Sequence, residues 1–202
     1  MAREPLESVR VDREVPSVRI VREQAPHPFH PWHHALAQRS QIAPAGAANV
    51  GPMDWPPSFY ELRRGEGCPM CGQGRPDETP YGARIFAGEV SDAYLQRADV
   101  QRGYTIVVWR GRHVAEPTEL STDEAARYWL EVVEVGRRLE RHLEPVKMNY
   151  DVLGNSLPHL HTHVLPRYAD DPKPGWPFPF PEGEPEPIEE EAFRQDVEAL
   201  RG

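Results

Sequence analysis

Three histidines occupy alternate positions near the end of the 202-residue chain: His159, His161 and His163, in the run PHLHTHVLPR. Successive side chains of a β-strand point to opposite faces, so a strand here would place all three imidazoles on one face. The β-branched Thr162 and Val164 favour a strand, and a proline stands at each end of the run. The sequence therefore predicts one strand that carries a row of three groups titrating near neutral pH.

An imidazole can attack phosphorus and form a transient phosphoramidate, which divides one difficult displacement into two easier steps. The attacking imidazole must be neutral and held in one tautomer. A hydrogen bond from its other ring nitrogen to a nearby carbonyl would fix that tautomer. The alternative use of the three histidines is a catalytic zinc centre, but one strand face brings only two of them easily to one metal.

A second set of reactive side chains lies upstream, where Cys68 and Cys71 form a Cys-x-x-Cys pair. This spacing is typical of a structural zinc knuckle, which needs two further ligands to complete a tetrahedron. The candidates are His113 and His159. A redox pair would need a strand-to-helix turn after the cysteines, whereas Gly-Gln-Gly follows them here. Two inert thiols are the remaining alternative.

The elements that must position these residues can be predicted from periodicity. Residues 84–95 indicate a pair of strands with a turn near Gly88, and residues 104–109 form an apolar strand pattern. Ser121 and Glu124 resemble a capping box that begins a long amphipathic helix ending at Pro145. Residues 148–152 and the histidine run complete the pattern. The predicted fold is α+β, an antiparallel sheet with one main helix packed on it.

Proline marks the ends of the chain. Nine of the 23 prolines fall in residues 1–60 and seven fall in residues 172–187. Because proline interrupts both helices and sheet ladders, extended N- and C-terminal segments are predicted. We divide the chain into an N-terminal Pro/His-rich segment (1–51), a domain containing the cysteine pair and the histidines (52–170), and a Pro-rich tail with a short acidic helix (171–202).

Charge and hydropathy exclude several classes of function. The formal net charge of −9 argues against a sequence-independent grip on nucleic acid, which needs a basic surface. No run of about eighteen apolar residues indicates a membrane span, and the first residues lack the apolar core of a signal peptide. We therefore expect a cytoplasmic protein with reduced cysteines.

The histidine run, with the lead-in Gly154-Asn155-Ser156 and the ending Pro166-Arg167, resembles the motif of the histidine triad family. Within that family the Cys-x-x-Cys pair is similar to bacterial zinc-binding members. The resemblance runs from about Trp55 to Arg167. It implies the same α+β fold, a homodimer and a nucleotide substrate.

The resemblance also implies roles for individual residues. His161 would be the nucleophile that attacks the α-phosphorus, and His163 would contact phosphate or bridging oxygens. Structural zinc would be bound by Cys68, Cys71, His113 and His159, and His159 would help to orient His161. No catalytic metal is required.

Four residues are expected to bind the substrate. Asn155 and Ser156 would contact the phosphate, Asn149 the ribose or the active-site backbone, and Arg167 a phosphate.

The predicted function is hydrolysis of a (di)nucleoside polyphosphate or nucleotidyl conjugate through a nucleotidyl-histidine intermediate. One alternative is a nucleotidyltransferase that passes the nucleotidyl group to phosphate or a sugar phosphate. Another is a nucleotide-binding module without catalysis. Nothing in the residues identifies the base or the leaving group.

Overall fold

The computed structural model describes residues 55–181 and 185–202. The predicted N-terminal segment 1–51 therefore lies outside the described residues, and the domain boundaries drawn from the sequence stay predictions. The elements are α2 (Pro57–Arg63), α3 (Pro69–Gly72), β1 (Glu78–Thr79), β2 (Gly82–Ala87), β3 (Ser91–Gln96), β4 (Thr105–Trp109), the 3-10 turn η2 (Pro117–Glu119), α4 (Thr122–Leu143), β5 (Lys147–Asp151), β6 (His161–Arg167) and α5 (Glu190–Arg201).

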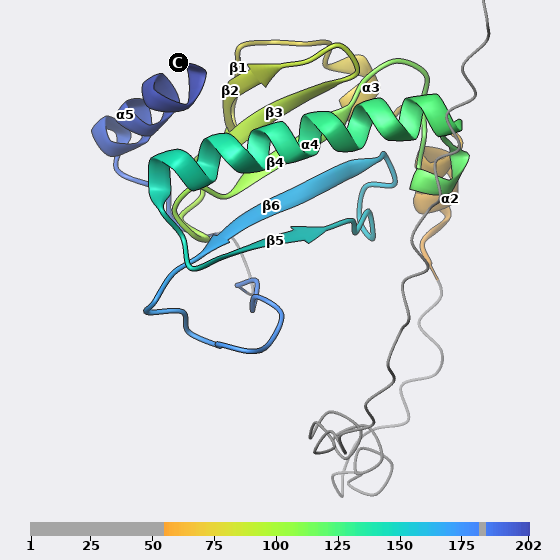
Figure 1. The fold of residues 1–202 in the computed structure, drawn as a ribbon. Coiled ribbons are helices and arrows are strands. Elements are labelled where there is room, and N and C mark those ends of the chain that lie inside the picture. The colour runs from red at the N-terminus through yellow and green to blue at the C-terminus, as the bar shows by residue number, and fades with distance from the viewer. Residues whose placement is uncertain (1–54, 182–184) are drawn as a thin grey trace, which may run out of the picture. The chain divides into compact units, whose positions relative to one another are not determined.

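One antiparallel sheet organises these elements (Figure 1). Its strand order is β1-β2-β3-β4-β6-β5, and every neighbouring pair is antiparallel. The predicted strand pair around Gly88 is β2 and β3, and the predicted apolar strand is β4. The α+β architecture expected from the sequence is confirmed.

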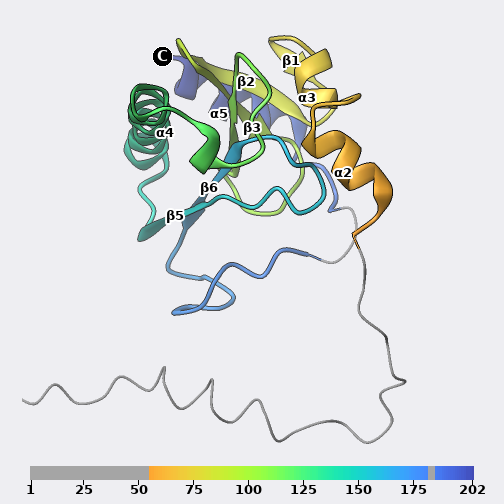
Figure 2. The ribbon, with the colours of Figure 1, turned by 90° about the vertical axis from the view of Figure 1, so that its right-hand side faces the viewer.

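Helix α4 lies across one face of this sheet, as Figures 1 and 2 show. The Ser121 hydroxyl accepts from the Glu124 amide and the Glu124 carboxylate accepts from the Ser121 amide, so the predicted capping box is present. The helix ends at Leu143, just before Pro145. Its buried side chains lie at helical spacing and pack against the sheet: Tyr128, Val132, Val135 and Leu139. Each such burial stabilises the fold by about 1.5–3 kcal/mol.

The acidic helix predicted near the C-terminus is α5. Phe193, Val197 and Leu200 are buried in the same core as the apolar face of α4. The buried Asp196 accepts from Arg102 and from His142 of α4. These contacts fix α5 against the edge of the core, so the sheet face that carries α4 is covered by two helices.

Strand β6 begins at His161, so the expectation that one strand carries all three histidines is wrong for His159. The His159 amide bonds to the Leu157 carbonyl and the Leu160 amide to the Val114 carbonyl. These two amides thus bond outside the β4–β6 ladder, whereas the Leu160 carbonyl still accepts from the Trp109 amide of β4. His159 lies just before the strand, and its ring contacts Cys68 and Cys71.

The register divides the side chains of β6 between two faces. Thr162 and Val164 belong to the α4 face, where the Tyr128 hydroxyl and the Thr162 hydroxyl lie 2.8 Å apart. His161 and His163 pair with Val108 and Ile106 of β4 and point to the opposite face. We call this opposite side of the sheet the histidine face.

The Pro-rich tail returns to the histidine face. Phe178 is buried in a small apolar cluster with Tyr104 and Leu165. The Phe180 ring lies 5.9 Å from the rings of both Tyr104 and His163, measured between centroids. These aromatic side chains of the tail therefore pack on the histidine face.

Among the described helices, none combines the length and the apolar character that a membrane span requires.

Candidate active site and metal centre

His161 is held in one orientation by the backbone of the residue two positions before it. Its Nδ1 lies 2.6 Å from the His159 carbonyl oxygen, which can only accept, so Nδ1 carries the proton. Burial lowers the pKa of His161, although this hydrogen bond acts in the opposite direction. The ring is therefore neutral at pH 7, and its lone pair is on Nε2.

The Nε2 atoms of His161 and His163 have no hydrogen-bond partner within the described part of the chain. Among the described residues, every fully buried side-chain nitrogen or oxygen has a hydrogen-bond partner. Because these two Nε2 atoms have none, they are not fully buried and reach the accessible surface. The two rings lie 4.8 Å apart between centroids. The histidine face thus presents two adjacent imidazole nitrogens to an incoming ligand.

His163 is half-buried, and a tyrosine and a phenylalanine contact its ring. Its Nδ1 is 2.6 Å from the Tyr104 hydroxyl, and Phe180 packs edge-on against its ring. Burial, followed by the neighbouring His161, lowers the pKa of His163 to about 4. His163 is consequently uncharged at neutral pH.

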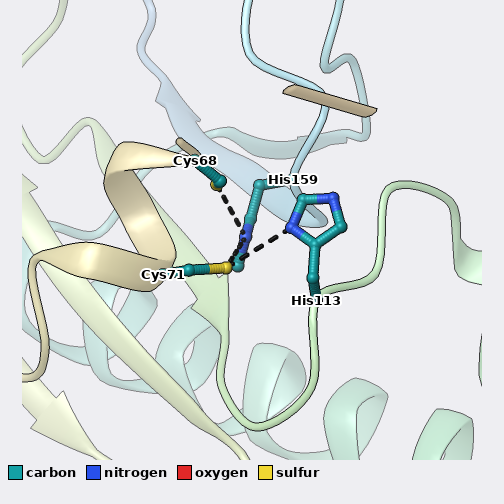
Figure 3. Close-up of side chains that lie close together, drawn as sticks. All are labelled: Cys68, Cys71, His113 and His159. Atoms are coloured by element: carbon teal, nitrogen blue, oxygen red, sulfur yellow. Dashed lines mark hydrogen bonds between the residues drawn. The ribbon is translucent and has the colours of Figure 1, made fainter. Parts of the chain in front are cut away.

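A second cluster shares His159 with the triad and joins side chains from three separate segments of the chain (Figure 3). One possible ligand atom from each residue lies within 4.8 Å of all the others. The members are Cys68, Cys71, His113 and His159. The structure therefore brings together the complete ligand set that the sequence and the family resemblance suggested.

Both imidazoles of this cluster offer Nδ1 to the sulfurs. The Nε2 of His159 donates to the Trp109 carbonyl at 2.9 Å, and the Nε2 of His113 donates to the Arg63 carbonyl at 3.2 Å. These carbonyls place the proton of each ring on Nε2. The lone pairs on Nδ1 are then free for a metal, a common way for a protein to orient its histidine ligands.

The distances within the cluster fit a tetrahedral ion. The Nδ1 of His159 lies 3.5 Å from Cys68 Sγ and 3.4 Å from Cys71 Sγ, and the Nδ1 of His113 lies 3.4 Å from Cys71 Sγ. Zinc bonds of about 2.3 Å to sulfur and 2.0–2.1 Å to nitrogen would separate S and N by about 3.5 Å. The donor set and its spacing therefore suit zinc.

Arginines attach the cysteine segment to the sheet. Arg110 donates to the Met70 carbonyl, between the two cysteines, and to the Asp92 carboxylate. Arg75 forms two further hydrogen bonds to Asp92. Burial alone would raise the pKa of Asp92, but the two arginines outweigh it and hold the pKa below its usual value. The charged Asp92 is thus an anchor for the segment that carries the cysteines.

Comparison with known proteins shows a similarity to one family. A family model described as the HIT domain matches residues 82–170, which contain His113 and all three histidines of the triad. We call this matched part of the chain the HIT domain.

Relatives of this HIT domain come from several bacteria. "Protein hit" of Bacillus subtilis strain 168 is 27% identical over 92 residues, covering 43% of this chain and 63% of that protein. The chain thus spans less than two thirds of that relative's length.

Solved structures show the same architecture. A histidine triad protein from Sinorhizobium meliloti 1021 is 26% identical with a TM-score of 0.53, covering 59% of this chain and 87% of that chain. A histidine triad protein from Marinobacter aquaeolei VT8 is 26% identical with a TM-score of 0.52, covering 59% and 86%. The sheet and main helix of the HIT domain are therefore those of known histidine triad proteins.

The predicted substrate-binding residues of the HIT domain occupy two places. Asn155 and Ser156 are exposed on the loop between β5 and β6. Asn149 lies on β5 opposite Leu165, which places it on the histidine face. The substrate contacts predicted for these residues stay predictions.

Arg167 is buried, and protein groups accept from all five of its N–H bonds. The acceptors are the Asp171 carboxylate, the Asn149 side-chain oxygen, and the carbonyls of Lys173 and Trp176. Arg167 therefore fixes the start of the C-terminal tail and holds the Asn149 amide in one orientation. A direct phosphate contact, as predicted from the sequence, would require these bonds to be exchanged.

Sequence reasoning missed Tyr104 and the carbonyl of Trp109. Each contacts a histidine at least fifty positions away in the sequence. Tyr104 reaches His163 through the pairing of β4 with β6, and the Trp109 carbonyl reaches His159 just before β6 begins. The available signal was the alternation of the predicted strand 104–109, which places Tyr104 on one face with every second residue of β4. The partner strand and its register were not contained in that pattern.

Proposed function

We propose that this HIT domain hydrolyses a nucleotide phosphoanhydride or phosphoramidate through a nucleotidyl-His161 intermediate. The observation that supports it most strongly is the 2.6 Å hydrogen bond from His161 Nδ1 to the His159 carbonyl. This bond places the lone pair on Nε2, an atom that reaches the accessible surface and has no partner among the described residues. A neutral, oriented imidazole is what attack on phosphorus requires.

In the first step Nε2 of His161 attacks the α-phosphorus of the nucleotide. An N–P bond forms, and the bond from phosphorus to the leaving oxygen or nitrogen breaks. The ring of His161 becomes positively charged. The carbonyl of His159 stabilises that charge because it accepts a hydrogen bond from Nδ1–H. The leaving group departs with the electron pair of the broken bond and takes its proton from solvent.

In the second step water attacks the same phosphorus. A P–O bond forms, the N–P bond breaks, and the water proton passes to solvent, which restores neutral His161. Donors near the phosphate lower the barrier of both steps because they stabilise developing negative charge. We assign this role to His163 and to the exposed Asn155 and Ser156.

Asn149 is proposed to contact the ribose or a phosphate. Its side-chain oxygen accepts from Arg167, which leaves the amide N–H groups for the substrate. Arg167 acts on the substrate through Asn149 in this arrangement.

Structural zinc is proposed at Cys68, Cys71, His113 and His159. Four protein ligands close a tetrahedral site and leave no position for a reacting water. The zinc would join the cysteine segment to the residue whose carbonyl orients His161, and it supplies folding free energy rather than a reaction step.

A homodimer is proposed through α4 and β5. Strand β5 is at the edge of the described sheet, and Tyr150 on it contacts α4 at Gly136. Trp129, Val133 and Tyr150 are 38–39% exposed and form one apolar strip with Gly136. A second copy of the chain would cover this strip and the free strand edge.

The dimer is tested by Val133→Glu, which places a charge in the apolar strip. We expect the mass from light scattering to change from two chains to one. The control is Arg141→Glu, at an exposed position of α4 about two turns of helix from Val133, which should leave the mass unchanged. A wild type that is monomeric at all concentrations would contradict the dimer.

The hydrolase is tested by incubating the wild type with diadenosine tetraphosphate, adenosine 5′-phosphoramidate and ATP and identifying the products. We expect release of AMP from at least one of them, and a loss of at least about 10³-fold in kcat for His161→Ala. His142→Ala, which removes an imidazole on α4, should retain kcat.

Two results would redirect the proposal. An adenylated product that appears only when phosphate or galactose 1-phosphate is added would indicate a nucleotidyltransferase. Tight nucleotide binding by the wild type and by His161→Ala, without turnover by either protein, would indicate a binding module.

A further inference from the structure

The Tyr104 hydroxyl is the one protein partner of His163 Nδ1 in the described part of the chain. The oxygen and the nitrogen lie 2.6 Å apart, and the two ring planes are nearly parallel, at 9°. His161 and Phe180 pack against the same imidazole. His163 is therefore enclosed on three sides, and only its Nε2 edge is left for a ligand.

The backbone holds Tyr104 firmly in this place. The Tyr104 amide donates to the Gln101 carbonyl and its carbonyl accepts from the Gln96 amide. Gly103, which precedes it, has a φ of +81°, and a Cβ there would lie 2.2 Å from Leu143 Cδ1. Only glycine fits this turn without strain, and the turn directs Tyr104 onto the histidine face.

The proton of the hydrogen bond belongs to the phenol. Burial, followed by the charge of Asp151, raises the pKa of Tyr104 to about 12, so the hydroxyl is un-ionised at neutral pH. Within the described residues that hydroxyl has no acceptor other than Nδ1. A buried O–H that lacks an acceptor is unfavourable, because it loses its hydrogen bond to water without gaining another. The O–H therefore donates to Nδ1, and the single proton of neutral His163 is on Nε2.

We propose that Tyr104 is a positioning residue that fixes His163 in the tautomer with its proton on Nε2. In that tautomer His163 presents a donor to the ligand. In the other tautomer it would present a lone pair to anionic phosphate oxygens, and the two would repel. The tautomer of His163 follows from the structure alone, whereas its catalytic consequence rests on the proposed hydrolase.

His163 donates a hydrogen bond in this arrangement and does not transfer the proton. Loss of the Nε2 proton would leave an imidazolate unless Nδ1 took the phenolic proton, and a phenol with a pKa of about 12 resists that transfer. The donor therefore stabilises charge on a phosphate oxygen or on the leaving oxygen throughout the reaction.

The test is Tyr104→Phe, which removes the hydroxyl and keeps the ring. Tyr168→Phe is the matched control, because the Tyr168 hydroxyl donates to the Arg102 carbonyl at 3.0 Å and burial likewise raises the pKa of Tyr168 to about 12. Protein labelled with ¹⁵N-histidine is measured at pH 7 by long-range ¹H–¹⁵N correlation, and the His163 signals are assigned from their loss in His163→Asn.

We expect wild type and Tyr168→Phe to show protonated Nε2 and bare Nδ1 at His163. Tyr104→Phe should show a mixture of the two tautomers, with a thermal midpoint recorded to establish that it is folded. In the activity assay it should lower kcat about tenfold or more with KM nearly unchanged.

Protonated Nδ1 at His163 in the wild type would overturn the proposal, and so would an unchanged tautomer in folded Tyr104→Phe. If Tyr104→Phe shifts the tautomer of His163 but the wild type turns over no nucleotide, the positioning role is supported and the hydrolase is overturned. The positioning role and the hydrolase are thus tested separately.

Discussion

The carbonyl oxygen of His159 lies 2.6 Å from Nδ1 of His161, while the ring of His159 lies between the two cysteines. One residue thus belongs to both clusters, with its side chain in the proposed metal centre and its backbone against the proposed nucleophile. A second carbonyl, that of Trp109, fixes the His159 ring. Order in the metal centre should therefore determine the orientation of His161.

This coupling predicts the effect of Cys68→Ser. We expect wild type to bind about one zinc per chain and the variant to bind less, and the thermal midpoint of the variant should fall by on the order of 10 °C. Its kcat should fall as well, because the His159 carbonyl loses its fixed position. Metal analysis, calorimetry and the hydrolysis assay measure the three effects. Equal zinc content in variant and wild type would refute the metal centre.

Asp196 predicts a pH-dependent contribution of α5 to stability. Burial would raise its pKa, but the hydrogen bonds from Arg102 and His142 outweigh burial and lower it. A carboxyl whose pKa is lowered by folding stabilises the protein fully above its unfolded pKa, about 3.9, and loses this contribution as the pH falls through its folded pKa.

The measurement is the urea midpoint of wild type and Asp196→Asn at several pH values. We expect a deficit of roughly 1–3 kcal/mol for the variant at pH 7 that shrinks below about pH 4. A deficit that stays constant down to the acid transition would mean that the charge of Asp196 is not the stabilising feature.

The contact between Phe180 and His163 predicts how burial affects the pKa of His163. Burial is the main cause that lowers the pKa of His163 to about 4. Phe180→Ala removes a ring that lies 5.9 Å from His163, so water should reach the imidazole and the pKa should rise toward about 6.5. Tyr81→Ala, at a residue that is 74% exposed, should leave it unchanged. An NMR titration of His163 decides, and an identical pKa in Phe180→Ala would show that the tail does not bury His163.

The sequence was sufficient to predict the main strands, the helices α4 and α5, and the reactive residue types. The alternation from His161 onward and the capping box at Ser121 are local patterns, and both are found as predicted. The cluster of Cys68, Cys71, His113 and His159 was also anticipated, because the knuckle spacing indicates the two cysteines and the family resemblance implies the two histidines.

What the sequence did not reveal depends on contacts between distant segments. Tyr104 reaches His163 only through the β4–β6 register, and Phe180 only because Arg167 directs the tail back over the sheet. The start of β6 was placed too early because His159 continues the alternation in sequence while its backbone bonds elsewhere. Such pairings are set by tertiary packing, which no local periodicity encodes.

Capture of the covalent nucleotidyl-His161 intermediate is the most direct test of the proposed chemistry. Purified protein is mixed rapidly with diadenosine tetraphosphate carrying ³²P at the α-position and quenched in alkali, in which a phosphoramidate survives. We expect label on the wild-type chain, mapped to His161 by mass spectrometry, and none on His161→Ala. Turnover of the substrate without label on His161 at any mixing time, or equal labelling of His161→Ala, would contradict the intermediate.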